Sequence, residues 1–297
     1  MTRAVVVGAQ GLLGRALTRA LRARLGEAQV RALDHGALDV TDPDCAQSPL
    51  LDGAQVVFNC AAYTHVDRAE DEAAAAFAVN RDGVMHLARA ARERDALLVH
   101  VSTDFVFDGR SQRPYRPDDR PAPLSAYGWS KWAGEEALFA SKARYLLVRT
   151  AWLFGLSGRN FVDTILRRAA AGERLQVVCD QTGSPTYAAD LATALVDLWQ
   201  RRCTGAYHCT NRGAATWHEF ACEIVRRAGL DAPVGPVTTD AYPRPARRPR
   251  YAVLDCSATE QALGRPMRMW QAALADCLSR RGTADRPKGD TAPCAHS

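Results

Sequence analysis

Two side chains in the segment SAYGWSK (125–131) are suited to acid–base chemistry. Tyr127 and Lys131 are four positions apart, so on a helix they project from the same face. An ammonium group beside a phenol favours the phenolate and lowers the pKa of the phenol, which can then exchange a proton near neutral pH. Such a pair also occurs by chance on many helix surfaces, so its surroundings decide its meaning.

The segment before this pair predicts a buried strand that ends in hydroxyl groups. LLVHVSTD (97–104) is rich in leucine and valine, and Ser102 and Thr103 stand near its carboxyl end. In a parallel sheet, the carboxyl ends of the strands line the crevice in which ligands bind. We therefore expect Ser102 or Thr103 to hydrogen-bond a substrate carbonyl.

A glycine-rich turn near the N-terminus predicts a phosphate-binding site. Gly8, Gly11 and Gly14 lie between the strand-like AVVV and an amphipathic helical segment. Glycines at this turn let the backbone approach a pyrophosphate, whose charge the helix N-terminus favours. The spacing differs by one residue from the usual dinucleotide pattern, so a tight turn that binds nothing is the alternative. Asp34 ends the next strand about 20 residues later, where either a ribose-binding carboxylate or an exposed turn aspartate is expected.

The elements that would position these residues alternate along the first half of the sequence. Short β-branched runs are followed by alanine-rich helical stretches, which predicts βαβ units and an α/β, doubly wound parallel sheet of the Rossmann type. Later insertions predict a smaller substrate-binding lobe over the carboxyl edge of this sheet. We expect a dinucleotide-binding domain at 1–152, to which 186–211 return, a lobe from 153–185 and 212–281, and a disordered tail at 282–297.

Composition narrows the class of protein. The 297 residues are 47% hydrophobic and 24% charged, as in a soluble globular protein. The longest apolar runs fall far short of the roughly 20 residues that a membrane helix needs, and MTR leads straight into a strand without a signal peptide. We therefore expect a cytoplasmic protein without a membrane partner.

The cysteine, histidine and charge patterns argue against a metal-binding protein and against a nucleic-acid-binding protein. The nine cysteines include no C-x-x-C pair and the seven histidines no H-x-x-x-H pair, which predicts reduced thiols and no metal site. The net charge of +5 is mild, and much of it lies in YPRPARRPRY (242–251). This segment is either a solvated loop or a polyanion contact. Because no aromatic-rich platform accompanies it, we expect no nucleic-acid partner.

Several motifs together resemble the dTDP-4-dehydrorhamnose reductase family of the extended short-chain dehydrogenases/reductases. They are G-x-x-G-x-x-G, NCAAYTHVDRAE, VNRDG, STDFVFDG, AYGWSK and RTAWLFG, followed by DQTGSPT and ARRPRYAVLD, and they extend the resemblance to about residue 280. The resemblance implies reduction of the C4 keto group of dTDP-4-dehydro-6-deoxy-L-mannose to dTDP-L-rhamnose, with NADPH or NADH. Related 4-ketoreductases of nucleotide sugars share these motifs.

The same resemblance implies roles for individual residues. Tyr127 would protonate the C4 oxygen, Lys131 would hold the nicotinamide ribose and lower the pKa of Tyr127, and Thr103 would hydrogen-bond the carbonyl. Cofactor-binding positions are Gly8, Gln10, Gly11, Leu12, Leu13, Asp34, Asp39, Ala61, Ala62 and Tyr63, with Tyr127 and Lys131. Substrate-binding positions are Thr64, Val66, Asp104, Trp152 and Arg248, the last of them near the nucleotide diphosphate.

Some of these positions also have a structural interpretation. Trp152 at a strand end could belong to the core, and Asp39 in LDVTD could cap a turn. Asn80 in VNRDG could bridge two strands through its amide as readily as it could take part in the chemistry. Arg248 could be a solvated surface residue.

Departures from the family pattern leave alternatives open. Phe105 stands where the rhamnose enzyme commonly has tyrosine, so a sister 4-ketoreductase for another deoxysugar or an antibiotic pathway is the alternative. Ala16 and Ala189 occupy positions that are acidic in members joined by magnesium, so we expect a monomer or weak homodimer without an interfacial metal. A non-catalytic, nucleotide-binding regulatory subunit is a third hypothesis, against which the intact catalytic set argues.

Overall fold

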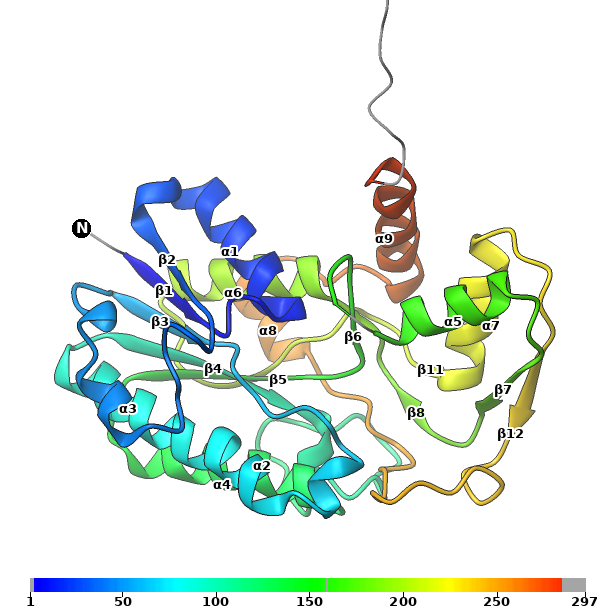
Figure 1. The fold of residues 1–297 in the computed structure, drawn as a ribbon, viewed down its shortest axis with the longest axis horizontal. Coiled ribbons are helices and arrows are strands. Elements are labelled where there is room, and N and C mark those ends of the chain that lie inside the picture. Colours follow the sequence, from blue (N-terminus) through cyan, green and yellow to red (C-terminus); the bar gives the residue numbers. More distant parts are fainter. Residues whose placement is uncertain (1–2, 159, 285–297) are drawn as a thin grey trace, which may run out of the picture.

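The computed structural model describes residues 3–158 and 160–284, and its centre is a parallel sheet of six strands (Figure 1). The strands are β1 (Ala4–Val7), β2 (Val30–Leu33), β3 (Val56–Asn59), β4 (Leu97–Thr103), β5 (Tyr145–Thr150) and β10 (Gly205–His208). Their order is β10-β5-β4-β3-β1-β2, and all of them are parallel. The chain adds β2 on one side of β1 and β3 on the other, so the direction in which successive strands are added reverses between β1 and β3. This reversal is the topological switch point at which doubly wound sheets bind ligands.

Helices cover both faces of the sheet. The helices of this part are α1 (Leu12–Leu25), α2 (Ala73–Phe77), α3 (Gly83–Glu93), α4 (Ala126–Ala140) and α6 (Ala188–Gln200), with a π-helical turn at Ala78–Asp82. Along β1, Ala4 and Val6 pack on the side of α1 and α6, whereas Val5 and Val7 pack on the side of α3. This alternation follows from the period of two in a strand and gives the sheet an apolar core on each face. The predicted Rossmann-type fold is confirmed.

A smaller lobe lies beyond the carboxyl ends of the strands (Figure 1). It contains β6 (Leu153–Phe154), α5 (Phe161–Ala170), β7 (Leu175–Val178), β8 (Thr182–Gly183), β9 (Thr186–Tyr187), β11 (Ala215–Thr216), α7 (Trp217–Arg227), β12 (Val234–Val237) and α9 (Trp270–Ala284). Phe154, Phe220 and Trp270 belong to an apolar core that is separate from the two cores of the sheet. Helix α8 (Ser257–Leu263) comes from the same half of the sequence but packs against α6 and β10, with Leu263 in a core of the sheet.

The expected domain boundaries stay predictions. Within the described residues, α9 continues to Ala284, past the expected start of the tail at residue 282, and positions 285–297 of that tail lie outside the described part. No helix in the part of the chain that the structure describes is both long enough and apolar enough to cross a bilayer.

Candidate active site

Helix α4 brings Tyr127 against the end of β4. The hydroxyl of Ser125 accepts a hydrogen bond from the Gly128 N–H at 3.2 Å and caps the start of the helix. A Cβ on Gly128 would lie 2.5 Å from the carbonyl oxygen of Phe105, so only glycine allows this close approach of α4 to the segment after β4. Tyr127 is consequently buried, and its phenol lies near enough to the Thr103 hydroxyl for Thr103 to influence its pKa.

The environment of Tyr127 keeps its phenol protonated. The side chain is 8% exposed, and its ring meets Phe105 edge to face with 5.4 Å between the ring centres. Burial raises the pKa of Tyr127 to about 12; the Thr103 side chain opposes this, and the nearby Asp104 adds to it. The expected lowering of the Tyr127 pKa is therefore not met, because the loss of solvent dominates. A protonated phenol is the form that a general acid requires.

Lys131 lies one turn further along α4 and is held against β4. It is 2% exposed; its Nζ donates to the carbonyl oxygen of Val101 at 2.8 Å and lies 3.5 Å from Nε2 of His100. Burial lowers the pKa of Lys131 to about 8, while Glu135 and Cys60 act in the opposite direction. The ammonium is therefore the main form of Lys131 at neutral pH, and the side chain begins to lose its proton as the pH rises toward 8.

Asp104 follows β4 directly and is buried beside the proposed catalytic residues. One carboxylate oxygen, Oδ1, accepts a hydrogen bond from the Thr103 hydroxyl at 3.0 Å. The other, Oδ2, is buried and has no hydrogen-bond partner among the described residues. Burial raises the pKa of Asp104 to about 7, although Thr103 and the backbone N–H of Phe105 oppose the shift. The structure thus brings together Thr103, Asp104, Tyr127 and Lys131.

The glycine turn between β1 and α1 has the geometry of an anion-binding turn. Gly8 has a φ of +74°, and a Cβ there would lie 2.6 Å from the backbone nitrogen of Ala61. A Cβ on Gly14 would lie 2.2 Å from the carbonyl oxygen of Gly8, so α1 packs directly on the turn. Gly11 provides no side-chain cap, and the first turn of α1 carries no acidic residue. These features leave the helix N-terminus suited to a pyrophosphate, and the residues present fit a dinucleotide.

The two carboxylates expected to contact the cofactor, Asp34 and Asp39, both have partners in their own turns. Asp34 is exposed and accepts a hydrogen bond from the Ala37 N–H at 3.0 Å. Asp39 accepts from both the N–H and the hydroxyl of Thr41, at 2.9 and 2.8 Å, and these bonds lower its pKa. Each carboxylate therefore stabilises a turn, and this leaves further lone pairs for a ligand.

The loop after β3 carries other expected contacts toward Tyr127. Tyr63 and Val66 pack in one apolar cluster with Tyr127, whereas Thr64 is exposed. Ala61 and Ala62 precede them along the same loop and are half-buried.

Asn80 ties this loop to α4. Its Oδ1 accepts from the N–H of Tyr63 at 3.0 Å, and its Nδ2 donates to the Tyr63 carbonyl at 3.1 Å and to the Ser130 hydroxyl at 2.9 Å. A Cβ on Gly134 would come within 2.0 Å of the Asn80 carbonyl oxygen, so helix and π turn are in close contact. The amide therefore bridges a loop and a helix, not two strands as the sequence suggested.

Trp152 follows β5 and lies half-buried in the smaller lobe. Its ring stacks on Trp217 with 3.5 Å between centres and 8° between planes. A Cβ on Gly183 would lie 2.5 Å from the Trp152 ring, so β8 passes directly over the indole. These contacts agree with the structural interpretation, and they also attach Trp152 to a residue that lines the neighbouring pocket.

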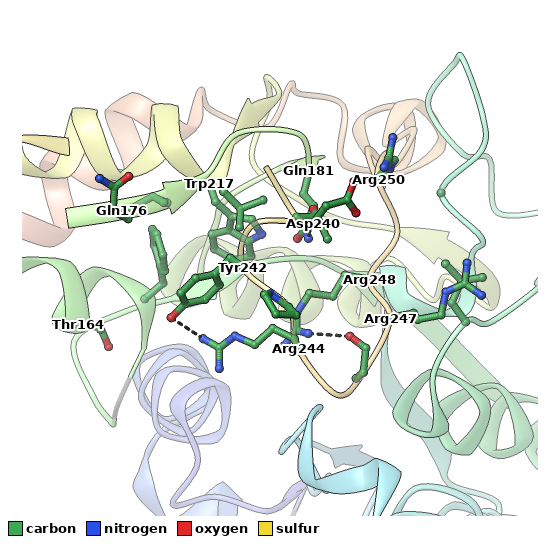
Figure 2. Close-up of a pocket in the computed structure, with 18 of the residues that line it drawn as sticks. Thr164, Gln176, Gln181, Trp217, Asp240, Tyr242, Arg244, Arg247, Arg248 and Arg250 are labelled. Carbon is green, nitrogen blue, oxygen red and sulfur yellow. Dashed lines mark hydrogen bonds between the residues drawn. The ribbon is translucent and has the colours of Figure 1, made fainter. Parts of the chain in front are cut away.

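A pocket of about 800 Å³ lies between the two parts of the chain (Figure 2). Phe161, Trp217 and Tyr242 form an aromatic wall. The pocket is also lined by six arginines: Arg110, Arg168, Arg244, Arg247, Arg248 and Arg250. Sequence reasoning selected only Arg248 as a ligand contact, although the basic segment 242–251 contains three more of the six.

Arg248 is ordered by protein contacts. It donates to the carboxylate of Asp67 at 2.9 Å and to the Ala246 carbonyl at 2.8 Å, while Arg244 lies 3.7 Å from the same carboxylate. Asp67 therefore holds two guanidinium groups on the same side of the pocket. A planar guanidinium can bind two phosphate oxygens at once, so this wall is suited to a diphosphate.

One loop joins the proposed catalytic residues to this pocket. Thr103, Tyr127 and Lys131 do not line the pocket, but Asp108, Gly109 and Arg110 follow β4 by only a few residues and do line it. Gly109 has a φ of +73°, and a Cβ there would lie 2.5 Å from Cα of Pro249. The loop therefore passes directly against the arginine-rich segment.

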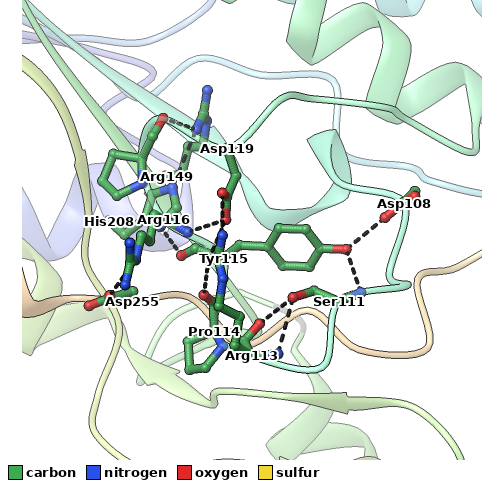
Figure 3. A network of polar contacts seen from close by, with 11 residues as sticks. Asp108, Ser111, Arg113, Pro114, Tyr115, Arg116, Asp119, Arg149, His208 and Asp255 are labelled. Atoms are coloured by element: carbon green, nitrogen blue, oxygen red, sulfur yellow. Dashed lines mark hydrogen bonds and ion pairs between the residues drawn. The ribbon is translucent and has the colours of Figure 1, made fainter.

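A network of polar contacts connects Arg149 and His208 to Tyr115 and Asp108 of this loop (Figure 3), and Arg149 extends it to α4. The guanidinium of Arg149 on β5 lies 2.6 Å from the Glu135 carboxylate on α4, and both side chains are buried. Arg149 also lies 3.3 Å from Nε2 of His208, whose pKa is lowered to about 3 by burial and by this cation. Nδ1 of His208 lies 2.9 Å from the carbonyl oxygen of Tyr115, whose hydroxyl donates to Asp108 at 2.7 Å. Helix α4 and the pocket loop are thus connected through the buried side chains of Arg149 and His208.

A glycine turn at the switch point, together with a buried tyrosine and a lysine on one helix beside β4, defines a Rossmann-type, dinucleotide-dependent reductase. Residues 2–282 match the model of the RmlD substrate binding domain family, and the chain belongs to this family. The predicted resemblance is thereby confirmed.

Relatives of known name agree with this membership. A dTDP-4-dehydrorhamnose reductase of Streptomyces griseus is 45% identical over 96% of each chain. A dTDP-4-keto-6-deoxy-D-glucose reductase of Streptomyces niveus is 40% identical over 92% of this chain and 95% of the relative. The crystal structure of a dTDP-4-dehydrorhamnose reductase from Bacillus anthracis in complex with NADP superposes with a TM-score of 0.90 at 35% identity, over 94% of this chain and 100% of that one.

Proposed function

We propose that the protein reduces the C4 keto group of dTDP-4-dehydro-6-deoxy-L-mannose to dTDP-L-rhamnose, with NADPH or NADH as the reductant. The observation that carries the proposal is the buried Tyr127 phenol, which lies beside the end of β4 and one helical turn from the buried Lys131. The dTDP-sugar reductases among its relatives support the substrate class.

In this reaction a bound nicotinamide supplies the hydride. Tyr127 gives its phenolic proton to the C4 oxygen, which becomes a strong base as the carbonyl is reduced. The Thr103 hydroxyl has one proton, which it donates to Asp104 in this structure; with substrate bound it would turn this proton to the C4 oxygen and orient the keto group. The Lys131 ammonium stabilises the phenolate that remains on Tyr127. The proton and hydride together give the C4 hydroxyl.

The glycine turn and the loop after β3 would hold the cofactor. The pyrophosphate would bind at the N-terminus of α1, Asp34 and Asp39 would contact the adenosine side, and Lys131 would hold the nicotinamide ribose. The remaining proposed cofactor contacts are Gly8, Gln10, Gly11, Leu12, Leu13, Ala61, Ala62 and Tyr63.

The arginine-lined pocket would take the nucleotide diphosphate of the substrate. Its volume of about 800 Å³ is within the usual range for a site that binds a small molecule. Arg248 would contact the diphosphate while its bond to Asp67 holds the side chain in place. Its guanidinium has five N–H donors, and the bonds to Asp67 and Ala246 use only some of them. Thr64, Val66, Asp104 and Trp152 are the proposed neighbours of the sugar.

Phe105 favours a second candidate, a 4-ketoreductase that acts on another deoxysugar. Its ring packs against Tyr127 and offers no hydroxyl to a sugar, where the rhamnose enzyme commonly has tyrosine. The 40% identical relative from Streptomyces niveus, named for a keto-deoxyglucose substrate, is consistent with this alternative.

One reaction series separates the two candidates. The protein is incubated with dTDP-4-keto-6-deoxyglucose and NADPH, with and without a 3,5-epimerase, and the product is identified by NMR. Formation of dTDP-L-rhamnose only when the epimerase is present supports the proposal. Equal reduction without the epimerase supports the second candidate. No oxidation of NADPH in either mixture contradicts both, and Tyr127→Phe is the matched inactive control.

The state of assembly and the location of the protein stay predictions. We infer a monomer or weak homodimer without an interfacial metal, because Ala16 and Ala189 have no atoms that coordinate an ion. In residues 3–158 and 160–284 no group of three or more histidine, cysteine, aspartate or glutamate side chains could hold a metal. A cytoplasmic location, and the absence of nucleic-acid and membrane partners, rest on the sequence alone.

A further inference from the structure

A buried histidine lies behind the proposed cofactor-binding lysine. His100 stands in the middle of β4 and is fully buried in a strand that is otherwise mostly apolar. Its Nδ1 lies 3.2 Å from Nδ2 of Asn59, which ends β3, and its Nε2 lies 3.5 Å from Nζ of Lys131. Asn59, His100 and Lys131 form a polar triad between two strands and α4.

The hydrogen bonds around Asn59 fix the tautomer of His100. The backbone N–H of Ala61 can only donate, and it donates to Oδ1 of Asn59 at 3.0 Å. The other amide atom of Asn59 is therefore the NH₂ group, a pure donor, and it faces Nδ1 of His100. Nδ1 has to accept this bond, so the neutral ring carries its proton on Nε2.

This tautomer points an N–H at Lys131. Burial and the nearby Lys131 lower the pKa of His100 well below its ordinary value, so the ring stays neutral. A pyrrole-type N–H cannot accept a hydrogen bond from an ammonium group. The ammonium hydrogens are consequently directed to the Val101 carbonyl, at 2.8 Å, and away from the ring.

The triad begins at the turn that would hold the cofactor. Ala61, which donates to Asn59, is also the residue that a Cβ on Gly8 would strike at 2.6 Å. The glycine turn, Ala61, Asn59 and His100 are therefore in continuous contact as far as Lys131. The other ionisable groups that act on Lys131 are Glu135 of α4 and Cys60 of the loop after β3.

We propose that His100 is a positioning residue, which with Asn59 fixes the Lys131 ammonium relative to the cofactor turn. The inference rests on the proposed function only in assigning Lys131 to the cofactor. His100 itself touches neither cofactor nor substrate. Its effect should therefore depend on Lys131.

A double-mutant cycle on NADPH binding tests this dependence. The dissociation constant of NADPH, without any sugar, is measured at neutral pH for wild type, His100→Leu, Lys131→Met and the double variant. We expect His100→Leu to weaken binding about tenfold in the wild-type background and to change it by less than about twofold in the Lys131→Met background. An equal loss in both backgrounds would overturn the proposal, because His100 would then act on the fold and not on Lys131. His218→Leu, a half-buried histidine on α7, is the matched control and should leave binding unchanged.

Two further measurements keep the proposal testable where the leucine variant does not fold. His100→Gln keeps an acceptor for Asn59 and a donor toward Lys131, so it should bind NADPH more tightly than His100→Leu; a glutamine variant that is as weak as leucine counts against the triad. In wild type, ¹⁵N NMR of labelled histidine should show His100 neutral, with Nε2 protonated, across neutral pH. A proton on Nδ1 or an imidazolium would overturn the assignment.

The same experiments distinguish failure of the proposed function. If the cycle gives the expected dependence but no dTDP-sugar is reduced, the positioning role stands and the substrate assignment is wrong. If the sugar is reduced but the cycle shows two independent losses, the proposed function stands and the positioning role is wrong. If wild type does not bind NADPH, the cofactor assignment fails, and the NMR measurement alone decides the tautomer.

Discussion

Asp104 should make the stability of the protein fall as pH rises. Burial raises its pKa from an ordinary 3.8 to about 7, so the folded state binds this proton more tightly than the unfolded chain does. Between about pH 4 and pH 7 the unfolded carboxyl ionises while the folded one does not, and the free energy of unfolding decreases over this window. A pKa difference of about three pH units corresponds to about 4 kcal/mol, a contribution that is fully present below about pH 4 and lost above about pH 7.

Asp104→Asn removes this contribution with little change of shape. The amide keeps an oxygen that can accept the hydrogen bond of the Thr103 hydroxyl, and it has no proton to lose in this range. Urea unfolding at about pH 5 and pH 8 measures the change. About two of the three pH units lie between pH 5 and the folded-state pKa of about 7, so we expect the variant to gain about 3 kcal/mol of stability relative to wild type on going from the lower to the higher pH.

The comparison between the two pH values is the informative quantity, because the introduced asparagine side chain has its own packing cost at both. Asp231→Asn, at an exposed site on the smaller lobe, is the control and should leave the difference unchanged. The reasoning is refuted if the difference in unfolding free energy between wild type and Asp104→Asn is the same at both pH values. Asp104 would then ionise in the folded state as it does in the unfolded chain.

Four further outcomes are expected. Tyr127→Phe should lower kcat by roughly 10² or more while NADPH still binds, because only the positioned acid is removed; a near-normal rate would place the proton source elsewhere. Lys131→Met should reduce both the rate and the affinity for NADPH, and a loss of rate alone would contradict the ribose contact. EDTA or magnesium should leave activity and sedimentation unchanged, whereas a dimer split by chelation would reveal a metal at other residues. Asp34→Ala should weaken NADH relative to NADPH by about 1.5–3 kcal/mol, the worth of a charge-assisted hydrogen bond, and an unchanged ratio of kcat/KM for the two cofactors would leave Asp34 a turn residue.

Local sequence signals were sufficient to predict where the proposed catalytic residues lie in the fold. Thr103 is placed by the end of a strand and Tyr127 by the helix that follows, and both signals are contained in a few consecutive residues. The turn at Gly8 and Gly14 could also be predicted from the sequence, because a tight turn between a strand and a helix requires glycine at these positions. The alternation of strands and helices then determines the parallel sheet and the edge where the site lies.

Properties that depend on contacts between distant segments could not be predicted from local sequence signals. The partners of Asn80 come from the loop after β3 and from α4, so its amide alone could not reveal them. Arg110 and Arg168 line the same pocket from segments that are far apart in sequence. The basic segment 242–251 signalled a cationic surface, but only the fold shows that it faces a cavity.

The pKa of Tyr127 is the clearest case, and it changes how the tyrosine–lysine pair is understood. The four-residue spacing suggested that Lys131 prepares the phenol by lowering its pKa, but burial keeps Tyr127 protonated, with a pKa raised to about 12, and Lys131 is bound to β4, with a pKa lowered to about 8. The phenol does not have to be a strong acid at rest, because the C4 oxygen becomes far more basic once it receives a hydride. In the proposed mechanism the ammonium is then needed after proton transfer, to stabilise the phenolate. The buried contacts of Lys131 with Val101 and His100 fit a role in holding the ammonium in place better than a role in lowering the Tyr127 pKa beforehand.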